Sequence, residues 1–458
     1  MNLESAFAEL AARYGNRFST NHAQREQHGH GESNAVLFPP DAVVWPESTE
    51  EVADIVRTCA RHRVPMVPFG AGTSLEGHIA AVRGGLCIDV SRMDQVLECS
   101  AEDLDCTVQP GITREGLNHA LRETGLFFPV DPGANATIGG MTSTRASGTT
   151  TVRYGGMSAN VLALEVVTPQ GEIVRFGSRA RKTSAGYDLV HLMTGAEGTL
   201  GVITAITLRL HPRPESVGTL TCAYPAMRAA VDTVIELVQL GAPLARMEFI
   251  DEVAARACNA WSRMDLPEAP TLFIEFHGTA AAVAEQLDRA REVAAGHGAS
   301  AVHATTDEQE LARLWRARHT AYHAGRALRP GTDAVTADIA VPVSRLADHV
   351  VAAREDLDAN GLTAVIVGHV GDGNFHVLFL HEPAPSEERD RVDAVYARMI
   401  KRAQGDGGTC TGEHGIGLGK RDKLAAEFPA GTLALMRAIK QAWDPHDLMN
   451  PGKILPDA

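Results

Sequence analysis

Apolar and polar positions follow two periods along this chain, which together predict a mixed protein of helices and strands. In residues 49–62 the apolar side chains recur at helical spacing behind an acidic opening, at Val52, Ile55, Val56 and Cys59. Another helix is expected at 113–124, with Thr113 as its N-cap. Runs of β-type residues between the helices predict strands at 64–69, 86–90, 105–111, 161–167, 172–176 and 201–210.

A break in composition at Pro212 and Pro214 marks a domain boundary. Beyond it, strands are expected near 217–223, 271–277 and 364–380, and helices near 225–240, 280–296, 307–325, 344–359 and 386–404. Helices that alternate with strands predict an α+β domain. The chain is therefore divided into an N-terminal helix with a polar linker from Asn21, a first domain, a second domain and a tail, at 1–34, 35–213, 214–449 and 450–458.

Composition narrows the class of protein. The chain has 458 residues and a net charge of −15, which argues against a nucleic-acid binder. Its seven cysteines form no CxxC pair, which suits reduced thiols in the cytoplasm and argues against an iron–sulfur cluster. No secretory signal and no apolar run long enough for a membrane helix is seen, so membrane contact is expected to be peripheral at most.

Three glycine-rich segments lie in the first half, at 68–77, 131–149 and 195–203. Glycine lets the backbone approach a ligand closely, and successive N–H groups can hold an anion. None of these segments matches GxGxxG or GxxxxGK[ST], so dinucleotide-type and Walker-type loops are excluded. One such loop is as often structural as functional. Three together predict backbone wrapped around a large cofactor with a pyrophosphate and a flat ring.

Two segments in the second half carry candidate metal ligands. His369 and His376 bracket the turn Gly371-Asp372-Gly373, so the two strands of a hairpin can bring them together. Two such histidines are compatible with a structural role or a metal site. Glu413 and His414 follow in a glycine-rich stretch, where one of them can bind a metal while the other faces a substrate. Two histidines with a carboxylate suit zinc or manganese.

The order of these segments resembles one family. PFGAGTSLEG, FPVDPGANATIGGM, GAEGTLGVIT, GHVGDGNFH, CTGEHGIG and NPGKIL are similar to motifs of the vanillyl-alcohol-oxidase type flavoproteins, in particular the FAD-linked D-2-hydroxyacid dehydrogenases, over residues 35–456. That family includes cytochrome-type D-lactate dehydrogenases, D-2-hydroxyglutarate dehydrogenases and the flavin subunit of glycolate oxidase. The resemblance implies an FAD-binding domain of the p-cresol-methylhydroxylase type, made of two α/β subdomains, and an α+β cap domain with an antiparallel sheet.

The resemblance also assigns roles to residues of this chain. Those expected to bind FAD are Pro68, Gly70, Ala71, Gly72, Thr73, Ser74, Pro132, Gly133, Thr137, Gly139, Gly140, Ser143, Ser147, Glu197, Gly198, Gly201, Ile203 and Asn450. Thr73 stands where members with covalent flavin carry a histidine, so non-covalent FAD is expected. The metal ligands implied are His369, His376 and Glu413, and His414 is the implied base.

A 2-hydroxyacid is then expected to lose its hydroxyl proton to His414 and a hydride to flavin N5, with the metal polarising its oxygens. Arginine suits a carboxylate, and the resemblance favours Arg318 over Arg316 on the predicted helix; a solvated helix face is the alternative. The chain has no haem or iron–sulfur motif, so electrons are expected to leave to a quinone, a cytochrome or an electron-transfer flavoprotein. Any stable assembly is expected to be a homodimer.

Two positions at which this chain differs from some relatives bear on the size of the substrate. Relatives specific for hydroxyglutarate carry a lysine and an asparagine where this chain has Thr336 and Leu378. An apolar pocket for a short tail favours D-lactate or a slightly longer 2-hydroxyacid. The alternatives are the flavin subunit of glycolate oxidase, a D-2-hydroxyglutarate dehydrogenase, and a flavin-binding subunit without catalysis.

Overall fold

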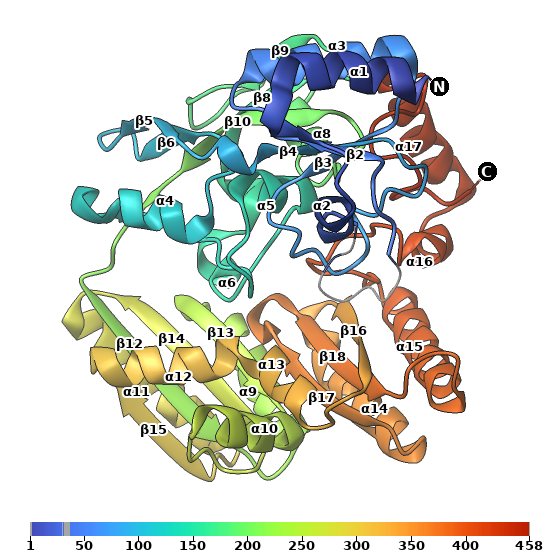
Figure 1. The fold of residues 1–458 in the computed structure, drawn as a ribbon. Helices are drawn as coiled ribbons and strands as arrows, with labels where there is room; N and C mark the ends of the chain where they lie inside the picture. The colour runs from blue at the N-terminus through green and yellow to red at the C-terminus, as the bar shows by residue number, and fades with distance from the viewer. Residues whose placement is uncertain (1, 30, 32–36, 458) are drawn as a thin grey trace. The chain divides into compact units, whose positions relative to one another are not determined.

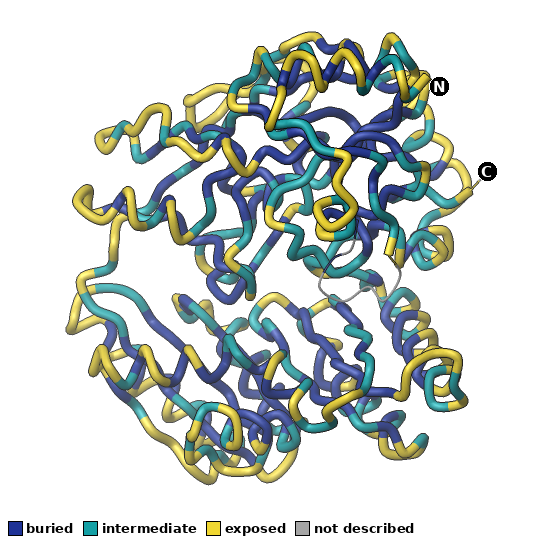
Figure 2. The backbone as a smooth tube through the Cα atoms, in the orientation of Figure 1, coloured by how far each residue is buried: buried dark blue, intermediate teal, exposed yellow. Residues whose placement is uncertain are grey.

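The computed structural model describes residues 2–29, 31 and 37–457, which form two compact units (Figure 1). The first unit comprises Met1–Ser147, Gly155–Arg213 and Glu413–Ala458, and the second comprises Gly148–Tyr154 and Pro214–Gly412. In each unit the strands are largely buried and the helices expose one side (Figure 2). No helix among the described residues has both the length and the apolar character needed to cross a membrane.

The first unit contains a four-stranded sheet in the order β1-β2-β4-β3. Its strands are β1 (Phe18–Ser19), β2 (Ala42–Val44), β3 (Met66–Phe69) and β4 (Leu86–Asp89). β2 and β3 pair with β4 in parallel, and α3 (Thr49–His62) connects β2 to β3. The predicted stripe of α3 is confirmed, because Val52, Ile55, Val56 and Cys59 are fully buried.

A five-stranded antiparallel sheet completes the first unit, in the order β5-β6-β10-β8-β9. Its strands are β5 (Val96–Ser100), β6 (Asp105–Val108), β8 (Val161–Val167), β9 (Ile173–Gly177) and β10 (Val202–Arg209), and β7 (Leu126–Phe127) pairs with β11 (His211–Pro212). The other helices are α1 (Leu3–Tyr14), α2 (His22–Gln27), α4 (Arg114–Ala120), α5 (Ile138–Thr144), α7 (Met157–Asn160), α8 (Leu189–Met193), α16 (Arg421–Glu427) and α17 (Ala430–Trp443). Two sheets with their own helices agree with the expected pair of α/β subdomains.

The predicted polar linker from Asn21 to Asn34 is wrong in its first part, because α2 occupies it. The Asn21 side chain caps this helix by accepting hydrogen bonds from Ala23 N and Gln24 N, and the residues after it are helix formers. Linker residues 30 and 32–34 lie outside the described residues.

The second unit is built on a seven-stranded antiparallel sheet in the order β15-β12-β14-β13-β17-β18-β16. Its strands are β12 (Ser216–Ala223), β13 (Leu244–Ile250), β14 (Thr271–Gly278), β15 (Ala301–Thr305), β16 (Asp333–Ala340), β17 (Thr363–Gly368) and β18 (Asn374–His381). Its helices are α6 (Thr151–Tyr154), α9 (Met227–Gln239), α10 (Glu252–Ser262), α11 (Ala280–Gly296), α12 (Glu308–His319), α13 (Ala321–Ala327), α14 (Leu346–Ala359) and α15 (Glu387–Gly405). The expected α+β unit with an antiparallel sheet is confirmed, although the helix predicted at 307–325 is split into α12 and α13.

One face of this sheet packs on α10, α12 and α13. Ile250, Phe273, Val365 and Leu378 lie in one apolar cluster with Leu314 and Trp315 of α12. Since side chains alternate along a strand, Glu248 and His376 share this face with Ile250 and Leu378. The face is therefore apolar in one region and polar beside it.

Residues 413–449 were expected in the second domain, yet the structure groups them with the first unit. Backbone hydrogen bonds explain this grouping. The Glu197 carboxylate accepts from Ile416 N and Gly417 N, and Glu76 O accepts from Leu418 N and Gly419 N. Sequence patterns placed the boundary at Pro214 but did not show that the chain returns to the first unit.

Candidate functional site

The three glycine-rich segments meet inside the first unit. A Cβ at Gly70 would overlap Thr137 Oγ1, and one at Gly198 would lie 3.2 Å from the Pro68 ring. Glu197 N donates to Ser143 O at 2.8 Å, which joins the second segment to the third. Segments that are far apart in the sequence thus lie in contact within the first unit.

A cavity of about 460 Å³ lies beside the first of these segments. It is lined by Gly70, Ala71 and Gly72 together with aromatic and polar side chains, namely Trp45, Phe69, His28, Asp89 and Ser91, among others. Ser74 Oγ is buried and has no hydrogen-bond partner among the residues that the structure describes. A buried hydroxyl beside a glycine-rich loop fits an absent polar ligand such as the pyrophosphate of FAD.

Other residues expected to bind FAD differ in their surroundings. Gly139 packs against Pro110, while Gly133 is exposed and has open space around it. Asn450 Nδ2 donates to His78 O at 2.8 Å and to Glu197 O at 2.7 Å, so this amide fastens the C-terminal segment to the unit. The remaining expected residues, Thr73, Pro132, Gly140, Ser147, Gly201 and Ile203, all belong to the first unit.

The Glu197 side chain binds the backbone of the C-terminal segment, a role that the sequence did not reveal. It is buried, lies 3.4 Å from His78 Nε2, and accepts hydrogen bonds of 2.7 Å from Ile416 N and Gly417 N. Burial alone would raise its pKa, but His78 and these two N–H donors hold the pKa below its usual value. The ionised carboxylate therefore fixes the backbone directly after Glu413 and His414.

In the second unit the predicted hairpin brings its two histidines together. A single 3-10 turn, Val370–Asp372, connects β17 to β18, and Gly373 follows with a φ of 74° that favours glycine. The ring centroids of His369 and His376 are 5.2 Å apart. The prediction that these histidines converge is confirmed.

His369 faces a buried carboxylate from a neighbouring strand. Its Nδ1 lies 2.7 Å from Glu248 Oε1, and Glu248 has no exposed surface. The other oxygen, Oε2, lies 2.5 Å from Arg318 Nη2. Arg318 is buried on α12, whereas Arg316 is exposed, so the structure places the favoured arginine toward the sheet.

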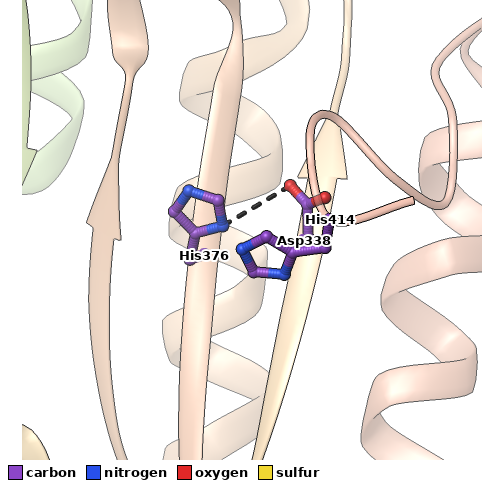
Figure 3. A group of neighbouring side chains, drawn as sticks. All are labelled: Asp338, His376 and His414. Atoms are coloured by element: carbon purple, nitrogen blue, oxygen red, sulfur yellow. Dashed lines mark ion pairs between the residues drawn. The ribbon is translucent and has the colours of Figure 1, made fainter. Parts of the chain in front are cut away.

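His376 faces a second buried carboxylate, Asp338, across β16 and β18 (Figure 3). His376 Nδ1 lies 3.4 Å from Asp338 Oδ1, which also accepts from Asn374 Nδ2 at 2.8 Å. Asp338 Oδ2 accepts from Thr411 Oγ1 and Gly412 N, each at 2.9 Å. This carboxylate thus contacts His376 and fixes the residue that precedes Glu413 in the chain.

The two histidines share a pattern that is typical of metal ligands. His369 Nδ1 is hydrogen-bonded to Glu248, which favours the tautomer that keeps its Nε2 lone pair available, and His376 Nδ1 lies 3.4 Å from the Asp338 carboxylate. Carboxylate–histidine pairs of this kind orient ligands around zinc and related metals. The donor chemistry of His369 and His376 therefore fits a divalent metal.

Comparison with known proteins identifies the family of the chain. Residues 40–177 match the model of an FAD binding domain, and residues 213–454 match that of the C-terminal domain of FAD linked oxidases. The chain belongs to the FAD-linked oxidase family. It is 48% identical over 440 residues to "Probable D-lactate dehydrogenase, mitochondrial" of Danio rerio, which covers 95% of this chain and 88% of that protein.

Two further comparisons bear on activity and fold. This FAD-linked oxidase is 35% identical over 419 residues to "Glycolate oxidase subunit GlcD" of Bacillus subtilis, covering 91% of this chain and 89% of that protein. A crystal structure of p-cresol methylhydroxylase with substrate bound matches with a TM-score of 0.79 over 99% of this chain and 96% of that chain, at 19% identity. The expected p-cresol-methylhydroxylase fold is confirmed, and the protein is an FAD-linked oxidoreductase.

Sequence reasoning missed Glu248 and Asp338. Both are fully buried acids, in the strands Leu244–Ile250 and Asp333–Ala340. The first strand also contains Arg246 and the second also contains Asp333 and Thr336, so neither acid stands out in the sequence as buried. A charged residue is rarely fully buried unless it is paired. The partner of Glu248 is not visible in the sequence, because Glu248 and His369 are 121 positions apart.

Lys453 in the C-terminal tail of this FAD-linked oxidase is buried, and its burial should make the stability of the protein depend on pH. Lys453 Nζ donates to Ala80 O at 2.6 Å, and burial lowers the pKa of Lys453 to about 8 from 10.5. The buried ammonium therefore destabilises the folded state below pH 8, and this cost is relieved as the pH rises toward 10.5. Relative to Lys453→Met, the wild-type protein should gain up to roughly 3 kcal/mol over that interval. Denaturant unfolding of both proteins across the interval measures it, and parallel curves would contradict it.

Proposed function

We propose that this FAD-linked oxidase oxidises a D-2-hydroxyacid, with D-lactate as its preferred substrate, and passes the electrons to an external acceptor. The observation that carries the proposal is the pair His369 and His376, each with Nδ1 facing a buried carboxylate. We take this pair as ligands of a divalent metal, which can polarise the α-hydroxyl group of a 2-hydroxyacid that a flavin oxidises. The name of the Danio rerio relative supports D-lactate.

FAD would be held by the glycine-rich segments and Ser74, and a zinc or manganese ion by His369, His376 and Glu413. When bound, FAD supplies a hydride acceptor and the metal supplies Lewis-acid polarisation of the substrate oxygens. The protein supplies proton transfer and orientation. His414 takes the hydroxyl proton, because imidazole titrates near neutrality.

Arg318 is the proposed anchor for the substrate carboxylate. Its guanidinium is held by Glu248 at 2.5 Å, so the side chain is fixed before substrate binds. Fixing the anchor reduces the entropy lost on binding and orients the Cα–H bond. Since the pair of Glu248 and Arg318 is neutral overall, it can be buried at a far lower cost than a lone cation.

The chain also carries a feature that bears on substrate length. Thr336 and Leu378 face each other in the register of β16 and β18, two residues along from Asp338 and His376 on the same face. A medium-sized hydroxyl residue and an apolar one offer no positive charge for a second carboxylate. The pair therefore favours lactate over 2-hydroxyglutarate.

Converting these two positions should change specificity. The double variant Thr336→Lys and Leu378→Asn is expected to raise kcat/KM for D-2-hydroxyglutarate relative to D-lactate by about 10- to 100-fold, as one charge-assisted contact provides. The control exchanges exposed Thr183 for Lys. If the double variant keeps the wild-type ratio, this pair does not face the distal end of the substrate.

The proposed function is tested by anaerobic titration of the yellow protein with D-lactate, L-lactate, glycolate and D-2-hydroxyglutarate, recording the flavin band. Bleaching by D-lactate at the lowest concentration supports the proposal. Bleaching by glycolate alone would instead assign the chain to the glycolate oxidase type, which the Bacillus subtilis relative represents. A protein that binds FAD but is bleached by none of the four acids would overturn the proposal.

A further inference from the structure

Glu248 lies between the proposed metal ligand His369 and the proposed substrate anchor Arg318. It sits on β13, whose next residue, Phe249, pairs with Gly368 immediately before His369. Helix α12 packs on the face of the sheet to which Glu248 belongs, through Leu314 and Trp315. Its Arg318 reaches the same carboxylate. One side chain with no exposed surface therefore contacts two groups of different function.

Each oxygen of Glu248 has a separate partner. Oε1 is 2.7 Å from His369 Nδ1, and Oε2 is 2.5 Å from Arg318 Nη2. His369 donates a hydrogen bond when it carries its proton on Nδ1, and Arg318 forms an ion pair, so only a carboxylate satisfies both partners together. An amide would accept from one partner and turn its NH₂ group toward the other.

We infer that Glu248 is a positioning residue that couples metal binding to substrate binding. Through Oε1 it fixes the His369 tautomer that leaves Nε2 available as a metal ligand. Through Oε2 it fixes the guanidinium of Arg318. A change at Glu248 should therefore weaken both metal affinity and substrate affinity. This inference rests on the function proposed above.

The neighbouring strand provides a matched control. Glu275 on β14 is also almost fully buried, and it too contacts a histidine and an arginine: His277 Nε2 at 2.8 Å and Arg246 Nη1 at 3.3 Å. It shares the face of Phe273 and therefore of Glu248. Neither His277 nor Arg246 is a proposed ligand. Glu275→Gln thus reproduces the loss of a buried charge without touching His369 or Arg318.

The experiment compares Glu248→Gln, Glu275→Gln and the wild-type protein, each containing FAD and stripped of metal. Zn²⁺ and Mn²⁺ are titrated against a competing chelator, which measures metal affinity without any turnover. Glu248→Gln is expected to weaken metal binding by about 10- to 100-fold, as loss of a partner behind a ligating histidine does. With saturating metal, its KM for D-lactate should also rise about 10-fold or more, because Arg318 loses its fixed position. Glu275→Gln should match the wild-type protein in both.

The other outcomes would contradict either the role of Glu248 or the proposed metal site. Unchanged metal affinity in Glu248→Gln, or an equal loss in Glu275→Gln, would overturn the role of Glu248. A wild-type protein that binds neither metal would instead overturn the proposed metal site itself, and the inference with it. If Glu248→Gln does not fold, Glu248→Asp keeps both acceptor oxygens one methylene further back. It should then show an intermediate loss of metal affinity, and wild-type affinity there would equally contradict the inference.

Discussion

Replacing His414 with glutamine should slow the reduction of bound FAD by D-lactate by about 10²- to 10⁴-fold, the usual contribution of a general base. Glutamine retains hydrogen-bonding groups and a similar size, but it cannot accept the hydroxyl proton at neutral pH. The FAD content should stay at one per chain, because the glycine-rich segments and Ser74 are unchanged. Anaerobic stopped-flow recording of the flavin band measures the rate.

His414 is well suited to this test because the backbone after it is fixed independently. Gly415 packs against the carboxylate of Glu197 and the ring of His78, and Ile416 N and Gly417 N donate to Glu197. Substitution of the His414 side chain should therefore leave the segment in place. His323→Gln, on the exposed side of α13, is the control and should keep the wild-type rate. A His414→Gln protein that reduces FAD at nearly the wild-type rate would place the base elsewhere.

The sequence predicted those parts of the site that depend on local chemistry. Glycine-rich segments signal backbone near a ligand, and Gly70, Thr137 and Gly198 do come together. A turn flanked by two histidines signals a hairpin, and the rings of His369 and His376 do converge. The glycine-rich segments are alike in composition, and the two histidines are close in the sequence. Both features can therefore be recognised without knowing any tertiary contact.

The parts that depend on long-range pairing could not be predicted in this way. The pairing of Glu248 with His369 requires β13 to lie beside β17, and no spacing in the sequence specifies that order. The C-terminal return of residues 413–449 depends on Glu197 more than 200 positions earlier, through contacts to Ile416 and Gly417. Strand β15 was missed because a short run such as Ala301–Thr305 becomes a strand only through its neighbour. Strands β13 and β16 were missed because charged residues interrupt their apolar runs.

The largest expected effect on metal binding comes from the hairpin itself. His369→Ala or His376→Ala should abolish stoichiometric binding of Zn²⁺ or Mn²⁺ and reduce D-lactate oxidation by about 10³-fold or more, since each removes one of the few protein ligands of a catalytic metal. FAD should remain bound, because its proposed ligands belong to the first unit and both histidines to the second. Metal analysis and the flavin spectrum of the same sample separate the two effects.

His381→Ala is the matched control for these variants. His381 is a buried histidine on the same strand as His376, but the alternation of side chains turns it to the opposite face, where its Nδ1 donates to Glu382 O at 2.6 Å. His381→Ala should therefore lose as much packing as His369→Ala or His376→Ala, but it should still bind the metal. Chelator-treated wild-type protein should resemble His369→Ala and recover when metal is added back, whereas the variant should not recover. If metal-free protein instead oxidises D-lactate at the full rate, the hairpin histidines have a structural role only, and the buried carboxylates Glu248 and Asp338 serve to hold them in the sheet.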